Sequence, residues 1–390
     1  MIELISNFAI NLSTVSGTVL LAIVSYPQLL DLILWLKEKR GRNPSHRDLN
    51  CENDSLDRFI MLLPWFEDEQ FLKKKLQNLQ HYLELGDVDF QVWILCVEEE
   101  RQTYQDLVDA FELKNEVKFP IRVMAHSEHQ KVHLLNHAIS KINSETVVIV
   151  SDVDAMFDSQ LSLQKLKNQF AADHNLSLVG AICRPSIDAY HLEQFHWKRE
   201  NQLRLREEHA FGAFFPVAPF YAFRRTMMEA FPDDCVSDDI YVALKCLSKG
   251  DRIALHKCLN LTEQRVPQSW QEYRLHKFRK LRTLYREVFR REFIGNILKS
   301  VFLVFRYTQL VLGPIAFFVL CISLMLENPI FSLSLLIGGI VLFSLVGKFT
   351  SRLKMLFLYY SMMPLWMLRA LWQTFFDRGN RLSFRISKPI

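Results

Sequence analysis

The chain has 390 residues, of which 49% are hydrophobic and 23% charged, and its formal net charge is +4. This length is enough for one large or two small domains with a core of their own. The small net charge argues against nucleic acid as a partner, because nucleic acid selects for a strongly basic surface. The seven cysteines contain no C-x-x-C pair and are expected to be reduced core residues.

The N-terminal region contains an apolar run over residues 15–36, about the 20 residues that a helix needs to cross a bilayer. No basic cluster precedes the run and no small-residue cleavage site follows it, so it does not fit a cleaved signal peptide. Basic residues follow it directly, at positions Lys37, Lys39, Arg40 and Arg42. We therefore predict a membrane anchor over residues 1–42, with the following chain on the cytosolic side.

Residues 43–267 have the pattern of an α/β domain, in which short β-rich runs alternate with amphipathic helical stretches. Strands are expected at residues 59–63, 90–97, 121–124, 146–150 and 178–184. This alternation predicts a largely parallel sheet of Rossmann-like type. Ligands of such sheets bind beyond the carboxyl ends of the strands.

The C-terminal part is predicted to be membrane-associated. Residues 268–298 place aromatic and aliphatic residues at helical spacing among arginines and lysines, which predicts an amphipathic helix at a membrane interface. Within residues 299–390, apolar stretches at 303–326 and 330–347 predict two spans. The stretch 355–375 is either a third span or a re-entrant or interfacial segment. These patterns predict a multi-pass integral membrane protein with a cytosolic α/β domain, in the inner membrane if the chain is bacterial.

Two carboxylates, Asp152 and Asp154, come directly after the strand expected at 146–150. Carboxylates one residue apart can share a divalent cation such as Mg²⁺ or Mn²⁺ and hold a diphosphate through it. A short aspartate pair at the end of a strand is, however, more often part of a turn or a helix cap. The neighbouring motifs decide between these interpretations.

Further motifs lie around this pair in a recognisable order. Pro64-Trp65-Phe66-Glu67 ends the first strand, Glu98 follows the second, a K-x-x-x-L-N-x-A segment begins at Lys131, and Ser237-Asp238-Asp239 lies downstream. In order and spacing this set resembles the family-2 glycosyltransferases of the GT-A fold, over residues 57–285. The apolar flanks resemble the integral members of that family, namely ceramide glucosyltransferases, poly-N-acetylglucosamine synthases and hyaluronan synthases.

The resemblance implies a role for each matching residue. It implies donor binding by Pro64, Glu67, Glu98, Lys131, Asp152 and Arg279. It implies metal binding by Asp154 together with Asp152, and a general base at Asp239. Asp238 and His276 are implied as acceptor-side or secondary residues. Arg279 and His276 occupy the family's Q-x-x-R-W positions, where this chain has Lys280 in place of the tryptophan.

The resemblance implies an inverting, metal-dependent transfer of a sugar from a nucleotide-sugar donor, in this family a UDP-sugar, to a membrane lipid, forming a β-glycosidic bond. Two alternatives stay open: a processive polysaccharide synthase that also exports its product, and a non-catalytic protein that binds a nucleotide sugar. The expected partners are therefore the donor, a lipid or glycan acceptor and membrane lipids. The identity of the sugar and the oligomeric state do not follow from the sequence.

Two other groups of residues have a functional and a structural interpretation. His129, His133 and His137 recur at helical spacing, which suits either a zinc site or, more commonly, a solvated or packed helix face. The aromatic group Phe211, Phe214, Phe215, Phe220 and Tyr221 either lines an acceptor groove or packs in a core.

Overall fold

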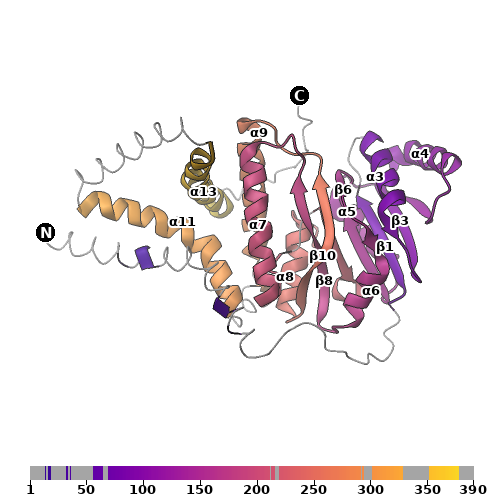
Figure 1. The fold of residues 1–390 in the computed structure, drawn as a ribbon, viewed down its shortest axis with the longest axis horizontal. Coiled ribbons are helices and arrows are strands. Elements are labelled where there is room, and N and C mark those ends of the chain that lie inside the picture. Colours follow the sequence, from indigo (N-terminus) through magenta and orange to yellow (C-terminus); the bar gives the residue numbers. More distant parts are fainter. Residues whose placement is uncertain are drawn as a thin grey trace. The chain divides into compact units, whose positions relative to one another are not determined.

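The computed structural model describes residues 14, 16–18, 32–33, 36, 56–64, 69–210, 212–215, 219–290, 292–293, 301–327 and 351–376. Figure 1 labels their helices and strands along the chain. These residues belong to two compact units. The first unit contains the described chain from Leu32 to Tyr273 and from Arg290 to Leu303. The second contains Arg274–Phe289 and the described residues from Val304 onward, together with the few described before Tyr26.

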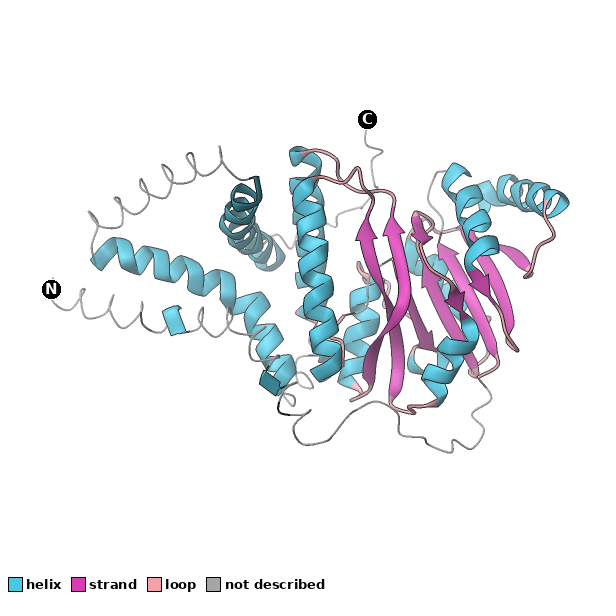
Figure 2. Ribbon diagram, in the orientation of Figure 1, coloured by secondary structure: helices cyan, strands magenta, loops and turns pink. Residues whose placement is uncertain are grey.

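An eight-stranded sheet forms the centre of the first unit, with the strand order β4-β3-β1-β5-β9-β8-β10-β6 (Figure 2). A separate two-stranded sheet pairs β2 with β7. The strands are β1 (Arg58–Pro64), β2 (Leu83–Glu84), β3 (Asp89–Val97), β4 (Ile121–His126), β5 (Thr146–Ser151), β6 (Ala155–Phe157), β7 (Leu161–Ser162), β8 (Leu176–Pro185), β9 (Phe220–Arg224) and β10 (Arg252–Glu263).

The sheet is mixed, whereas the sequence predicts a largely parallel one. Strands β4, β3, β1 and β5 are parallel to one another, but β9 runs antiparallel to both β5 and β8, and β6 runs antiparallel to β10. All five expected strands are present. The antiparallel strand β9 escapes sequence analysis because its residues Phe220–Phe223 are all buried, so it shows no alternation of apolar and polar residues.

The strand order reverses between β1 and β5. From β1 the chain proceeds outward to β3 and β4 and then returns to β5 on the other side of β1. The parallel register pairs Leu62 with Val150, so the residues that follow β1 and β5 leave the sheet next to each other. Such a reversal opens a crevice at the carboxyl ends of the strands, where a ligand can bind.

Helices pack against this sheet and bury a common core. The helices of the first unit are α3 (Glu69–Tyr82), α4 (Arg101–Lys114), α5 (Lys131–Ile139), α6 (Leu163–Ala171), α7 (His191–Ala210) and α8 (Asp238–Ser248), with short 3₁₀ turns η1 (Glu98–Glu100) and η2 (Arg225–Met227). Helix α3 forms because Leu72, Leu76 and Leu79 recur on one face and are fully buried. Each such side chain contributes about 2 kcal/mol of burial free energy.

The second unit contains α9 (Trp270–Val288) from Arg274 on, α11 (Val301–Glu327) from Val304 on, and α13 (Ser351–Phe376). The amphipathic helix expected within residues 268–298 is present as α9. Its buried residues Leu281 and Tyr285 pack with Ala370 and Leu371 of α13. Part of the apolar face that the sequence suggests for a lipid interface is therefore covered by protein.

Among the helices that the structure describes, none combines the length and the apolar character needed to cross a bilayer. The predicted transmembrane helices, and with them the localisation as a multi-pass integral membrane protein, are therefore wrong for the described chain. A high apolar content alone does not make a helix a membrane span. Helix α11 contains Pro314, and α13 contains Pro364. Helix α13 also contains Arg369, whose guanidinium lies 4.9 Å from the centroid of the Phe278 ring. The predicted span at 330–347 and most of the one at 15–36 lie outside the described residues.

Candidate active site

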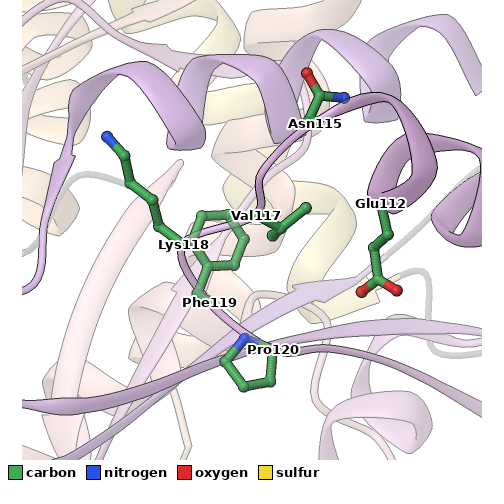
Figure 3. Close-up of a pocket in the computed structure, with 6 residues that line it drawn as sticks. All are labelled: Glu112, Asn115, Val117, Lys118, Phe119 and Pro120. Atoms are coloured by element: carbon green, nitrogen blue, oxygen red, sulfur yellow. The ribbon is translucent and has the colours of Figure 1, made fainter.

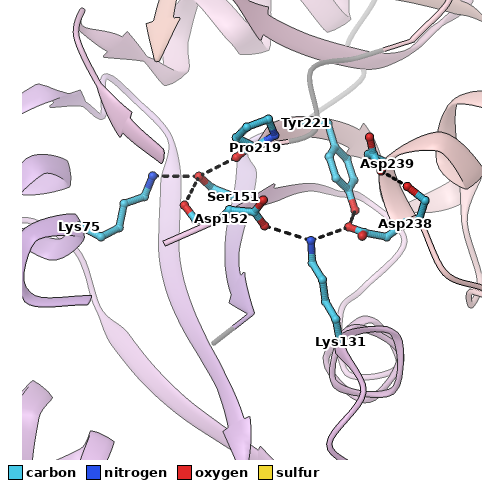
Figure 4. Close-up of polar contacts among 9 residues, drawn as sticks. Lys75, Lys131, Ser151, Asp152, Pro219, Tyr221, Asp238 and Asp239 are labelled. Atoms are coloured by element: carbon cyan, nitrogen blue, oxygen red, sulfur yellow. Dashed lines mark hydrogen bonds and ion pairs between the residues drawn. The ribbon is translucent and has the colours of Figure 1, made fainter. Parts of the chain in front are cut away.

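The acidic turn Ser151–Ala155 connects β5 to β6 at the carboxyl end of β5. The backbone N–H of Asp152 donates to the carbonyl of Pro219 at 3.0 Å, and the Ser151 hydroxyl donates to the same carbonyl at 3.3 Å. These bonds attach the turn to the segment that leads into β9 (Figure 4). Asp152 and Asp154 are both partly exposed, while Ser151, Val153 and Ala155 are buried, so the turn directs its two carboxylates away from the core.

Lys131 links this turn to the first residue of α8. Its Nζ lies 3.0 Å from Oδ1 of Asp152 and 3.0 Å from Oδ2 of Asp238 (Figure 4). The buried Tyr221 hydroxyl donates to the same Oδ2 of Asp238 at 2.6 Å. Although burial opposes a charge on Lys131, the two carboxylates hold its pKa above the ordinary value. Four elements, α5, β5, β9 and α8, thus converge on one ion-pair network.

Asp239 follows Asp238 in the first turn of α8 but has a different environment. The Ser237 hydroxyl donates to Oδ1 of Asp239 at 2.7 Å, and no lysine or tyrosine contact like those of Asp238 is seen for Asp239 among the described residues. Burial and the neighbouring charge of Asp238 raise the pKa of Asp239, against the effect of Ser237 and Lys131. A raised pKa suits a general base.

Asp154 lies near two other carboxylates, those of Asp152 and Glu263. Burial, Asp152 and Glu263 raise its pKa to about 7, and the guanidinium of Arg265, 3.9 Å from its Oδ2, compensates only in part. No group of three or more His, Cys, Asp or Glu in the described chain is arranged to hold a metal by itself. The residues nevertheless fit a hard cation such as Mg²⁺, which is commonly bound through one or two carboxylates, substrate phosphates and water.

The residues implied for the donor follow neighbouring strands, as far as the structure describes them. Pro64 is the last residue of β1 and pairs with Leu95 of β3, and Glu98 begins the η1 turn directly after β3. Glu98 is exposed and forms an ion pair with Arg101 at 3.3 Å. Glu67 lies outside the described residues. Pro64, Glu98 and Asp152 therefore share the carboxyl edge of the parallel strands, and their role in donor binding stays a prediction.

Arg279 and His276 lie on the part of α9 that belongs to the second compact unit. Burial lowers the pKa of His276, and the charges of Lys280, Lys277 and Arg279 lower it further. His276 is thus held neutral, which fits a packed residue better than an acid–base group. The implied roles of both residues stay predictions.

The histidines of α5 and the aromatic residues of the group at 211–221 that the structure describes contact neighbouring side chains or are buried in the core. The His137 ring lies 4.9 Å from that of His126, His133 Nδ1 lies 3.7 Å from a Glu128 oxygen, and no three-ligand metal cluster occurs in the described part of the chain. Phe214, Phe220 and Tyr221 are fully buried. For these three residues the core interpretation is correct, although Tyr221 also reaches the site through its hydroxyl.

The sequence motifs do not mark Lys75 as part of the site. Lys75 lies on α3, is fully buried, and donates from Nζ to the Ser151 hydroxyl at 2.9 Å (Figure 4) and to the Ala155 carbonyl. Burial lowers the pKa of Lys75 to about 7, against the charges of Asp154, Asp152 and Cys183. A signal exists in the sequence: Lys75 occupies the apolar stripe formed by Leu72, Leu76 and Leu79.

A cavity of about 390 Å³ lies elsewhere, at the connection between α4 and β4 (Figure 3). It is lined by Glu112, Asn115, Val117, Lys118, Phe119 and Pro120. Pro120 directly precedes β4, so the cavity lies at the amino end of this strand. The acidic turn follows the carboxyl end of β5, which runs parallel to the strands of that half of the sheet. The cavity is therefore not part of the candidate site.

We expect Lys131→Met to lower the free energy of unfolding by about 2 kcal/mol, because it leaves two neighbouring carboxylates without their shared cation. The expected loss is below that of a fully buried pair, since a quarter of the Lys131 side chain is exposed. Urea denaturation of the variant beside Lys141→Met, which removes an exposed lysine, measures the difference. Equal stability of the two variants would show that the network contributes nothing to folding.

No family model matches the sequence, and none of the curated proteins compared with it does. Solved structures do resemble it. A mannosyltransferase from Pyrobaculum calidifontis, solved with GDP-Man and Mn²⁺, has a TM-score of 0.61 at 16% identity, over 93% of this chain and 99% of its own. Glucosyl-3-phosphoglycerate synthase from Mycobacterium tuberculosis, solved with Mn²⁺, UDP-glucose and phosphoglyceric acid, has a TM-score of 0.41 at 12% identity, over 62% and 86%.

The likeness to the mannosyltransferase shows that the chain has a GT-A-like glycosyltransferase fold. The α/β part of the predicted fold agrees with this, whereas the transmembrane part is wrong, as described above. That neighbour is a mannosyltransferase, which belongs to the class of enzyme that the sequence predicts. Kinship with the integral lipid and polysaccharide enzymes of the family is not shown.

Proposed function

We propose that the protein transfers a sugar from a nucleotide-sugar donor, held through Mn²⁺ or Mg²⁺, to an acceptor hydroxyl with inversion at the anomeric carbon. The observation that carries this proposal is the network at the carboxyl end of β5, where Lys131 joins Asp152 to the start of α8. It brings the acidic turn and the carboxylates of residues 238 and 239, distant in the sequence, to one place on a GT-A-like fold. The solved mannosyltransferase of similar fold contains a nucleotide sugar and Mn²⁺.

The donor end of the reaction is assigned to the acidic turn. Asp154, with Asp152 beside it, would hold the cation, which when bound neutralises the departing nucleotide diphosphate. The carboxylates of Asp152 and Glu263 beside Asp154 favour a cation there, and Arg265 offsets them only in part. The Lys131 ammonium fixes the carboxylate of Asp152 facing α8. Since the leaving group is a stabilised diphosphate, the site needs no second carboxylic acid to protonate it.

The acceptor end of the reaction is assigned to Asp239. A carboxylate that removes the proton of the attacking hydroxyl must be ionised and accessible. Asp238 does not suit this role, because Tyr221 and Lys131 both occupy its Oδ2 and its side chain is only 10% exposed. Asp239 is less buried and its pKa is raised, so it suits the role of the base. One base and direct displacement imply inversion, and an α-linked donor would give a β-linked product.

For the substrates, we propose a UDP-sugar donor and a lipid acceptor, as the family resemblance implies. Large apolar side chains on the helices of the second unit are exposed, and exposed apolar surface of this kind supports an apolar partner. Trp372 is 65% exposed, Leu326 62% and Ile322 54%. Lys280 in place of the family's tryptophan favours a single transfer over chain elongation.

The test is a donor screen on the full chain that measures release of nucleoside diphosphate, with UDP- and GDP-sugars, lipid extract, and either Mn²⁺, Mg²⁺ or EDTA. We expect release with one donor class, dependence on the cation and a labelled product that carries one sugar on a lipid. A ladder of lipid-free chains would contradict the lipid acceptor. Absence of release with every donor would contradict catalysis and support a non-catalytic sugar-nucleotide-binding protein.

The raised pKa of Asp239 predicts a pH dependence. Because the base acts only when ionised, activity is present above its pKa and is lost as the pH falls through that value. We expect kcat/KM to fall on the acid side with an apparent pKa above 3.8, the ordinary pKa of aspartate, because burial and Asp238 raise the pKa of Asp239. Steady-state kinetics across pH at saturating Mn²⁺ measures it. A limb that persists unchanged in Asp239→Asn would belong to another group.

A further inference from the structure

Two polar residues of α3 are directed at the segment that contains the acidic turn. Lys75 and Asn78 are three residues apart, so they lie on the same side of the helix. Their neighbours Leu72, Leu76 and Leu79 are fully buried in the core. The helix therefore presents a polar pair from within an otherwise apolar face.

Lys75 bonds the two ends of the acidic turn. Its Nζ donates to the hydroxyl of Ser151 at 2.9 Å (Figure 4) and to the carbonyl of Ala155. These residues come immediately before and after the segment 152–154. The same Nζ lies 4.3 Å from the centroid of the Phe157 ring, which closes the site on another side. The Lys75 ammonium group thereby fixes the distance between Ser151 and Ala155, the two ends of the turn.

Asn78 fixes the strand that follows the turn. Its Nδ2 donates to the carbonyl of Phe157 at 3.0 Å, and the N–H of Phe157 donates to its Oδ1 at 2.7 Å. This reciprocal pair satisfies both backbone groups of a residue in β6. Lys75 and Asn78, here called the α3 clamp, therefore hold residues 151, 155 and 157 against one helix.

A buried lysine is costly to maintain, since its charge is removed from water. An apolar residue would complete the leucine stripe of α3 at lower cost, so core packing alone does not account for Lys75. The contacts instead concern the geometry of the turn. A turn held in place before a ligand arrives loses less conformational freedom on binding and binds more tightly.

We propose that the α3 clamp positions the acidic turn, so that Lys75 and Asn78, which do not touch the cation, determine how tightly Asp152 and Asp154 bind it. The inference rests on the proposed function in one respect, namely that the acidic turn binds the metal. It adds that α3 is a support of the metal site.

The test measures Mn²⁺ binding to the full chain in the presence of UDP, in Lys75→Met and in the control Lys74→Met. Free Mn²⁺ is quantified by electron paramagnetic resonance. Met keeps the length of the side chain and suits a core, so we expect an unchanged or higher melting temperature for Lys75→Met. We also expect its Kd for Mn²⁺ to rise about tenfold, which is typical when a supporting residue of a metal site is lost. Lys74 is exposed, and its variant is expected to bind like the wild type.

The outcomes separate this inference from the proposed function. An unchanged Kd in a folded Lys75→Met protein would overturn the inference and leave the metal role of the turn intact. If the wild type itself binds no Mn²⁺, both are overturned. Should Lys75→Met fail to fold, Asn78→Ala removes the other half of the clamp at a partly exposed position, and a wild-type Kd in that variant would equally overturn the inference.

Discussion

Asp154→Ala is expected to reduce sugar transfer at least about 10³-fold, because the leaving diphosphate loses the cation that neutralises its charge. We expect Mn²⁺ binding in the presence of UDP to fall below detection at the same time. The exposed carboxylate Asp158 lies four residues further along, and Asp158→Asn serves as the matched control with activity near that of the wild type. Titration with Mn²⁺ and assays of nucleoside diphosphate release measure both effects.

The same variant should become more stable without metal. The pKa of Asp154 is raised to about 7 in the folded protein, so ionisation of this carboxyl destabilises the fold progressively as the pH rises from about 4 to 7. Replacing Asp154 by Ala removes that cost, and we expect a higher melting temperature than the wild type in EDTA at pH 8. A variant that lost both stability and activity would show that Asp154 acts through folding and not through metal binding.

Asp239→Asn is expected to lower kcat by about 10³-fold and to leave Mn²⁺ binding within about twofold of the wild type, because only proton transfer is lost. The amide keeps the shape of the side chain and can still bond to Ser237. Asp233, exposed in the loop before α8, provides the matched control Asp233→Asn. Single-turnover measurements of product formation separate chemistry from product release.

Asp238 offers a second check on the assignment of the base. Because Asp238 is paired with Lys131 and Tyr221, Asp238→Asn is expected to weaken stability and donor binding together, unlike Asp239→Asn. If the loss of kcat were confined to Asp238→Asn, the two roles would be exchanged.

Local sequence patterns predict about half of the strands of the sheet. Whether a strand is predicted depends on how regular its pattern of apolar residues is. The central strands contain continuous apolar runs, Phe59–Leu63 in β1, Val92–Val97 in β3 and Val147–Val150 in β5, as central parallel strands require. Strand β10 contains register shifts and charged residues, so its pattern resembles neither a buried nor a half-buried strand. The prediction of membrane spans fails because apolar composition alone does not define an uninterrupted spanning helix.

Lys75 illustrates a different limit. It stands in the run Lys73-Lys74-Lys75, where the first two lysines are exposed and the third is fully buried. Only the phase of the helix distinguishes them, and the depth of burial depends on what packs against α3.

The sequence by itself determined the acidic turn after β5 and the acidic start of α8, since each depends on residue types close together in the chain. Only the tertiary structure decided that Lys131 joins Asp152 to Asp238, that Asp239 is left as the freer carboxylate, and that Lys75 holds the turn from behind. These facts depend on distances between residues that are from 21 (Lys131 and Asp152) to 107 (Lys131 and Asp238) positions apart in the chain. Such distances are set by the packing of α3, α5 and α8 around the sheet, and no local pattern encodes that packing.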